Sequence, residues 1–168
     1  MKLNGIKGKA KRKFKTTTTS KRQRPRAENL IKQDFHSSEP NKLWVSDITY
    51  SATLEGWLYL AVILDAFSRK VIGWAFSDRL TDDLVLSALH MAKQQRQTRV
   101  GLIHHSDQGS QYASHDFRAS LKDNDIIQSM SGRGNCYDNA LAESFFATLK
   151  TEEADGVPYE TKQQGKTS

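Results

Sequence analysis

The chain has 168 residues, 37% of them hydrophobic, which is enough for one domain with a modest core. Residues 1–32 hold 12 Lys and Arg and one acid, a net charge of +11, whereas residues 33–168 carry a net of −5. The single cysteine, Cys136, excludes an intrachain disulfide, and no apolar run approaches the roughly 20 residues of a membrane span. The basic N-terminus lacks the apolar stretch of a signal peptide, so we expect a cytoplasmic protein with no membrane partner.

Residues 1–40 are expected to form a basic, flexible arm, because they show no helical or strand periodicity that would bury a face. The longest basic run includes Lys11, Arg12, Lys13 and Lys15. Such a run favours a polyanionic partner, most simply DNA, with these four side chains on phosphates. The alternative is a solvated tail that only keeps the chain soluble.

Three strands are predicted in the first half of the globular part, at residues 43–51, 57–64 and 70–77. The first is rich in β-branched and aromatic residues, and the second is a continuous apolar run, as in a strand buried on both faces. The connections between these strands are only a few residues long, which favours antiparallel neighbours over crossovers.

The second half of the chain alternates helices and strands. One helix is predicted over residues 81–97 with Thr81 as its cap, and another begins after a capping Ser114. The remaining predicted elements are strands at 102–105 and 126–130, a loop at 131–137 and a third helix at 138–153.

The element order β-β-β-α-β-α-β-α predicts an α/β fold. Three antiparallel strands followed by α/β units make one mixed sheet flanked by helices. We expect this core to span residues 41–154 and residues 155–168 to be a frayed, polar tail.

Three carboxylates stand out in this order of elements. Asp47 lies within the first predicted strand, Asp107 follows the fourth, and Glu143 lies in the last predicted helix with 35 residues between it and Asp107. If the fold brings these acids together, they repel one another unless cations lie among them. Magnesium prefers such hard oxygen ligands, and a pair of divalent ions can activate a nucleophile and stabilise a leaving oxygen. The three acids therefore predict a divalent-metal site for phosphoryl transfer.

Each acid taken alone has a plainer interpretation. Asp47 would be an exposed edge-strand residue, Asp107 a turn residue and Glu143 a solvated helix residue, so only their combination indicates a site. Lys150 is seven residues after Glu143 and shares its helix face. We expect Lys150 and the loop residue Arg133 to contact DNA phosphates, with a solvated surface side chain as the alternative for both.

A zinc site is a weaker hypothesis. Adjacent histidines in a strand point to opposite faces, and the spacing fits no zinc finger. Asp65, at the end of the second predicted strand, is expected either to pair with Arg69 or to cap a turn. The residues that a zinc site would use are His104, His105, His115 and Cys136.

Four blocks of the sequence resemble the catalytic domain of bacterial insertion-sequence transposases, most closely the OrfB type of the IS-three family, relatives of retroviral integrase. The resemblance covers roughly residues 5–165, and the blocks agree in order and spacing. The blocks are residues 44–50 (Trp-Val-Ser-Asp-Ile-Thr-Tyr), 64–74 (Leu-Asp-Ala-Phe-Ser-Arg-Lys-Val-Ile-Gly-Trp), 105–112 (His-Ser-Asp-Gln-Gly-Ser-Gln-Tyr) and 131–146 (Ser-Gly-Arg-Gly-Asn-Cys-Tyr-Asp-Asn-Ala-Leu-Ala-Glu-Ser-Phe-Phe).

The resemblance implies a ribonuclease-H-like fold with a D,D(35)E triad, and Asp47, Asp107 and Glu143 fall on its three positions. It also implies magnesium or manganese, as two ions, and DNA as the substrate. In the implied reaction, water attacks at the ends of the element to free a 3′ hydroxyl, which then attacks a target phosphodiester.

Other positions follow from the same resemblance. Gly109 falls on the small residue after the second acid, and Lys150 on a DNA-contacting lysine. A second such lysine position is occupied by Ala147. The resemblance further implies association with other copies and a nucleoid location in the bacterial cytoplasm.

Full-length members of this family carry a helix-turn-helix region before the arm and a further helical segment after the last acid, so this sequence resembles a copy truncated at both ends. An alternative function is therefore a catalytically inactive remnant that binds DNA or forms mixed oligomers with a full-length transposase. A third is a ribonuclease-H-like nuclease that acts on RNA hybrids or junctions, against which the spacing of 35 and the loop at residues 131–139 argue.

Overall fold

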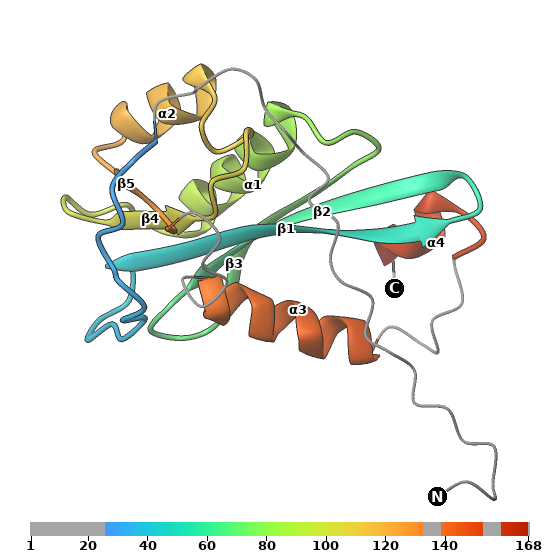
Figure 1. Cartoon of the computed structure of the whole chain (residues 1–168), viewed down its shortest axis with the longest axis horizontal. Helices are drawn as coiled ribbons and strands as arrows, with labels where there is room; N and C mark the ends of the chain where they lie inside the picture. Colours follow the sequence, from blue (N-terminus) through green and yellow to red (C-terminus); the bar gives the residue numbers. More distant parts are fainter. Residues whose placement is uncertain (1–25, 133–138, 153–158, 168) are drawn as a thin grey trace, which may run out of the picture.

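The computed structural model describes residues 26–132, 139–152 and 159–167, which form a five-stranded sheet with helices on both faces (Figure 1). Every strand and helix predicted from the sequence is present, with its described bounds within two residues of the predicted ones. The strands are β1 (Leu43–Thr53), β2 (Gly56–Asp65), β3 (Val71–Ser77), β4 (Ile103–Ser106) and β5 (Ile127–Met130). The helices are α1 (Asp82–Gln95), α2 (His115–Lys122), α3 (Ala140–Glu152) and α4 (Lys162–Thr167).

The strand order in the sheet is β3-β2-β1-β4-β5. β1 pairs with β2 and β2 with β3 in antiparallel fashion, whereas β4 is parallel to β1 and β5 is parallel to β4. The three strands joined by short turns are thus antiparallel, as predicted, and each later strand is reached through a helix. This confirms the mixed α/β fold, with β1 as the central strand.

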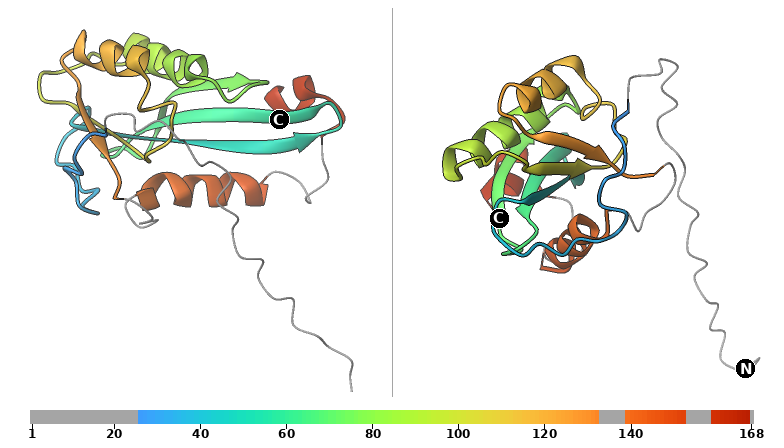
Figure 2. Two further views of the ribbon diagram at one scale, coloured as in Figure 1. Left: turned by 45° about the horizontal axis from the view of Figure 1, so that its top comes forward. Right: turned by 90° about the vertical axis from the view of Figure 1, so that its left-hand side faces the viewer.

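Helices α1 and α2 cover one face of the sheet and α3 covers the other (Figure 2), and the apolar core lies in two matching layers. The larger layer lies under α1 and α2 and includes the fully buried Trp44, Leu89 and Phe117. The smaller layer lies between the other face of the sheet and α3, and it includes Val45 and Leu141. Trp44 and Val45 are consecutive residues of β1, so the alternation of side chains along a strand determines which helices each residue meets.

The helix starts differ in how they are capped. Ser114 caps α2 as predicted, since its hydroxyl accepts a hydrogen bond from the backbone amide of Phe117 at 3.2 Å. Thr81 lies at the N-cap position of α1 but makes no side-chain cap hydrogen bond. Asp82 and Asp83 in the first turn of α1 instead place negative charge at the positive end of the helix dipole.

Part of the predicted arm packs against the body of the protein. Ile31 is buried in the smaller core layer. The amide of Leu30 donates a 2.9 Å hydrogen bond to Oγ of Ser129, and the amide of Met130 donates to the carbonyl of Glu28 at 3.3 Å. These hydrogen bonds are made to β5, about a hundred residues later in the chain. No local sequence pattern can therefore predict them.

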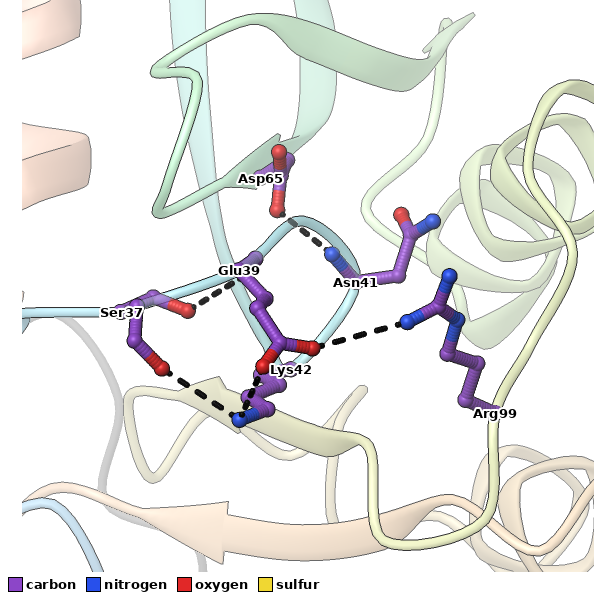
Figure 3. A network of polar contacts seen from close by, with 7 residues as sticks. Ser37, Glu39, Asn41, Lys42, Asp65 and Arg99 are labelled. Carbon is purple, nitrogen blue, oxygen red and sulfur yellow. Dashed lines mark hydrogen bonds and ion pairs between the residues drawn. The ribbon is translucent and has the colours of Figure 1, made fainter.

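A polar network lies where this segment enters β1 (Figure 3). The carboxylate of Glu39 is 3.1 Å from Nζ of Lys42 and 3.6 Å from the guanidinium of Arg99. Asp65, at the end of β2, accepts a hydrogen bond from the backbone amide of Asn41 at 3.1 Å. The ion pairs are half-exposed and contribute little to stability, but the buried Asp65 fixes the start of β1 against the end of β2.

Asp65 was predicted either to pair with Arg69 or to cap a turn, and the structure shows the second role. Its carboxylate accepts hydrogen bonds from the backbone amide and the hydroxyl of Ser68, at 3.2 and 2.6 Å. Arg69 contributes only its backbone amide, which donates to the carbonyl oxygen of Asp65 at 2.8 Å. Asp65 therefore caps the turn between β2 and β3.

The chain after α3 contains an element that the sequence did not predict. Tyr159 forms an isolated parallel bridge with Thr53, and its carbonyl accepts a 2.9 Å hydrogen bond from the amide of Leu54. α4 follows, and its buried Gly165 packs against Leu58 of β2. Residues 159–167 thus differ from the frayed tail that their polar composition suggested. Over the described ranges, no helix has both the length and the apolar character needed to cross a bilayer.

Candidate active site

Asp47 lies on the central strand of the sheet. Its side chain is partly buried, and Oδ1 accepts a hydrogen bond from the backbone amide of Ile48 at 2.8 Å. The neighbouring side chains of Ser46 and Thr49 are buried. The backbone of Asp47 pairs with Val62 of β2, and the pairing of β1 with β4 ends two residues earlier, at Val45.

Asp107 follows directly after β4. Its Oδ1 accepts a hydrogen bond from the backbone amide of Gly109 at 2.9 Å, which closes a tight turn on the carboxylate. A Cβ atom added at Gly109 would lie 2.9 Å from that same oxygen. Gly109 therefore lets the chain approach Asp107 as no other residue can without displacing the carboxylate.

The register of β1 and β4 brings these two acids together. Val45 and His105 are partners in the parallel pairing, and Asp47 and Asp107 each lie two residues further along. Burial and then the nearby carboxylate of Asp107 raise the pKa of Asp47 to about 7, although the amide of Ile48 opposes this. Burial likewise raises the pKa of Asp107, opposed by the hydrogen bond from Gly109. The pair is thus poised to bind a proton or a cation.

Glu143 and Lys150 lie on α3, which packs against β1. Both side chains are exposed, and both act on Asp47: the Glu143 carboxylate raises the pKa of Asp47 and the Lys150 ammonium lowers it. The effect of Glu143 is smaller than that of Asp107. α3 therefore presents one acid and one base toward the paired aspartates.

Tyr112 is a neighbour of both aspartates that the sequence analysis did not single out. Its side chain is buried, and burial together with the charges of Asp47 and Asp107 raises the pKa of its hydroxyl well above the usual range. The hydroxyl of Ser46 opposes this shift, yet no side chain in the described ranges forms a regular hydrogen bond with the Tyr112 hydroxyl. The only available signal was its place in the same sequence block as Asp107.

The zinc hypothesis does not fit the two neighbouring histidines. His104 lies in the larger core layer, with its ring 5.2 Å from that of Phe117, and burial lowers its pKa to about 3. His105 lies on the other side of the strand, 6.3 Å from the ring of Phe35 and 2.8 Å from Oγ of Ser129. Their rings therefore cannot share an ion.

Several predicted DNA contacts cannot be located. They lie outside the described residues, as does Cys136 of the zinc hypothesis. These residues are Lys11, Arg12, Lys13, Lys15 and Arg133.

The donor chemistry of the site suits a hard divalent cation. Asp47 and Asp107 offer carboxylate oxygens whose ionisation is costly in their partly buried surroundings, and a cation would offset that cost. Within residues 26–132, 139–152 and 159–167, no three His, Cys, Asp or Glu side chains are grouped closely enough to hold a metal ion as they stand. The fit to a divalent cation therefore depends on the two aspartates. Glu143 is a third carboxylate, on α3, whose charge raises the pKa of Asp47.

The chain is similar in sequence to the integrase core domain family and to insertion-sequence proteins. The integrase core domain family matches residues 37–136. The chain is 48% identical over 152 residues to transposase InsF for insertion sequence IS3fB of Escherichia coli (strain K12), covering 90% of this chain and 53% of the relative. It is 49% identical over 144 residues to the uncharacterized 31 kDa protein of insertion element IS600 from Shigella sonnei, covering 86% and 53%. The chain thus spans about half the length of these curated relatives.

Two retroviral structures share this fold. A simian T-cell lymphotropic virus intasome in complex with PP2A regulatory subunit B56 gamma matches with a TM-score of 0.64 and 26% identity, over 77% of this chain and 44% of that chain. The HTLV-2 integrase catalytic core domain in complex with magnesium (dimeric form) matches with a TM-score of 0.57 and 21% identity, over 69% and 72%. The sheet is therefore of the ribonuclease-H-like type found in retroviral integrase catalytic cores.

Proposed function

This chain belongs to the integrase core domain family, and from that premise we propose that it is the catalytic core of a DDE-type insertion-sequence transposase. The proposed reaction is metal-dependent cleavage at the ends of a DNA element, followed by attack of the freed 3′ hydroxyl on a target phosphodiester. The observation that carries the proposal is the alignment of Asp47 on β1 with Asp107 just after the parallel strand β4, with the Glu143 carboxylate on α3 raising the pKa of Asp47.

Each residue of the site has a task in this proposal. Asp47, Asp107 and Glu143 hold the divalent ions, magnesium or manganese, which supply activation of the nucleophile and neutralisation of charge on the leaving oxygen. Asp47 must lose its proton for this task, and Lys150 favours that loss because its ammonium lowers the pKa of Asp47. The amide of Gly109 keeps one oxygen of Asp107 in a fixed direction.

DNA is the proposed substrate and the main partner. Lys150 binds a backbone phosphate close to the carboxylates, which positions the strand without reading its sequence. The further phosphate contacts that we propose, from the concentration of positive charge in the arm and loop, are Lys11, Arg12, Lys13, Lys15 and Arg133.

We also propose that the chain assembles with copies of itself or of a longer relative. The intasome among the similar structures, and the dimeric and trimeric forms of the HTLV-2 integrase core, support assembly as a property of this fold. Action on chromosomal DNA would place the protein at the nucleoid.

A nicking assay tests the proposed function. The purified chain is incubated with labelled linear DNA that carries the genomic sequence flanking its coding region, with Mg²⁺, with Mn²⁺ or with EDTA. We expect metal-dependent nicks that Asp107→Asn abolishes, because the amide cannot supply a second charge beside Asp47, while DNA binding is kept. Asp123→Asn is the matched control, since Asp123 is an exposed residue at the end of α2.

Two outcomes would count against the proposal. Nicking by Asp107→Asn at the wild-type rate would remove the carboxylate assignment. DNA binding by a folded wild-type chain without any nicking would instead support the remnant that binds DNA or a full-length transposase.

A further inference from the structure

The β1–β2 hairpin carries an aromatic cluster that the proposed reaction does not use. Tyr50 and Tyr59 are cross-strand partners and Trp57 lies two residues before Tyr59, so the three side chains lie on one face of the hairpin. The Tyr50 ring meets that of Trp57 edge-on, with centroids 5.0 Å apart, and lies 6.3 Å from that of Tyr59. We call these three residues the hairpin aromatics.

The two faces of the hairpin are treated differently by the rest of the chain. Leu58, which points to the opposite face, is 2% exposed and packs against Gly165 of α4. Tyr50 and Trp57 are 55% and 53% exposed. A pair of rings is a normal way to stabilise a hairpin, and single exposed aromatics are common, so exposure by itself identifies no ligand.

Lys150 supplies an independent observation. Its Nζ lies 5.8 Å from the centroid of the Tyr50 ring, and its charge also acts on the carboxylate of Asp47. The ammonium therefore lies beside the exposed Tyr50 ring, on the helix that packs against β1, the strand that carries Asp47. A cation beside exposed rings is the combination that binds single-stranded nucleic acid, with phosphate on the cation and bases stacked on the rings.

We propose that the two exposed hairpin aromatics, Tyr50 and Trp57, stack unpaired bases of the DNA strand whose phosphate lies at the carboxylates, with Lys150 on the phosphate between them, while Tyr59 packs on the core beneath them. This inference rests on the proposed function and deepens it, because it names the state of the DNA that the site accepts. Stacking of this kind tolerates any base, since every base has a flat face. A second copy of the chain on the same surface would instead bury the Lys150 charge, at a cost unless it brought an acid.

Tryptophan fluorescence can test the proposal because the three tryptophans have distinct surroundings. Trp44 is fully buried, and Trp74 is 44% exposed on the edge strand β3. Trp74→Phe leaves Trp57 as the exposed reporter. Trp57→Phe leaves Trp74 as the matched control and keeps a ring against Tyr50.

The probes are duplexes that differ only at one end, measured in EDTA so that no cleavage occurs. One ends in a short run of unpaired thymines, one has abasic positions in their place, and one is fully paired. We expect the unpaired thymines to quench the emission of Trp74→Phe and to leave that of Trp57→Phe nearly unchanged. We also expect Trp57→Ser to weaken binding of the unpaired end about tenfold and that of the paired end hardly at all.

Three results would overturn the proposal. One is equal quenching by the abasic or fully paired ends, and another is a folded Trp57→Ser variant that binds every probe as tightly as the wild type. The third is Trp57 emission that changes with protein concentration in the absence of DNA, which would assign the surface to a second copy. Thermal unfolding by circular dichroism shows which variants are folded.

The experiments can refute the stacking proposal and the transposase proposal independently of each other. Quenching by unpaired thymines in a chain that never nicks DNA would keep the stacking surface and remove the catalytic function. Metal-dependent nicking without quenching would keep the catalytic function and remove the stacking surface.

Discussion

Asp47 on β1 and Asp107 just after β4 occupy equivalent positions along two parallel strands, because each follows by two residues a member of the pair Val45 and His105. Burial and the second carboxylate raise the pKa of Asp47 to about 7. An unfolded aspartate titrates near about 3.9, so proton binding favours the folded state. This stabilisation is complete below about pH 4 and is lost as the pH rises through about 7.

The first prediction concerns stability without metal. In EDTA, Asp47→Asn should be more stable than the wild type at about pH 8, by about 2–3 kcal/mol once the partial exposure of Asp47 is discounted, and the difference should vanish near pH 4. Mg²⁺ should stabilise the wild type above about pH 7 and Asp47→Asn much less, because it binds the ionised pair. Urea denaturation across this pH range measures both effects, with Asp123→Asn as control. An Asp47→Asn difference that does not vary with pH would contradict the argument.

Gly109→Ala tests the turn that holds Asp107. The new Cβ would lie 2.9 Å from Oδ1 of Asp107 and 3.4 Å from Oε1 of Gln111. Both atoms are at the ends of side chains, so the new methyl group can be accommodated without moving the backbone. The Asp107 carboxylate must then rotate away from its present position. We expect stability in EDTA close to that of the wild type and Mg²⁺ affinity lower by about tenfold. The shift of the thermal midpoint with Mg²⁺ concentration measures that affinity, and a wild-type response would show that the turn is unimportant.

Local patterns were sufficient to predict every strand and helix of the described chain except α4, and to choose the acids. The β-branched run of β1, the apolar stripe of α1 and the Ser114 cap depend on neighbouring residues and can be read directly from the sequence. That Asp47 lies beside Asp107 depends instead on strand order, because β4 pairs with β1 although β2 and β3 come between them in the chain. The register of that pairing is a long-range property that no local pattern contains.

The buried residues and the helix that the sequence did not predict were missed for one reason. Ile31, Tyr112 and Tyr159 are single apolar or aromatic residues in polar or irregular stretches, where no period marks them as buried. Each meets its partners only after folding: Ile31 the smaller core layer, Tyr112 the two aspartates, and Tyr159 the end of β1. A helix as short and polar as α4 likewise becomes recognisable only against the hairpin that it covers.

Lys150→Gln should have two separable effects. It removes a cation that lowers the pKa of Asp47, so that pKa should rise and the pH at which Mg²⁺ begins to bind should move upward. It also removes one phosphate contact, so the slope of log affinity against log salt should become shallower by about one. Lys122→Gln is the matched control, because Lys122 is an exposed lysine on α2, on the other face of the sheet (Figure 2). Equal salt slopes for the two variants would remove Lys150 as a phosphate contact.

Deleting residues 1–25 should flatten the salt dependence of DNA binding much more than either substitution. This segment holds ten Lys and Arg and no acid, and every phosphate that its side chains neutralise adds about 0.9 to the steepness of the slope. The deletion stops before the buried Ile31, so the thermal midpoint should stay close to that of the full chain. Anisotropy titrations at several salt concentrations measure the slope. A slope equal to that of the full chain would mean that the arm does not contact the DNA backbone.

Gly73→Ala makes the same chemical change as Gly109→Ala and should have the opposite pattern of effects. The new Cβ would overlap the carbonyl oxygen of Ala88 and lie 2.8 Å from the backbone nitrogen of Ala92. These are backbone atoms of α1, which can yield only if the helix moves away from β3. We expect a loss of about 2–3 kcal/mol in urea denaturation, with the Mg²⁺ response of the folded protein unchanged because α1 lies on the face of the sheet opposite α3 (Figure 2). A Gly73→Ala chain as stable as the wild type would show that α1 does not pack this closely on the sheet.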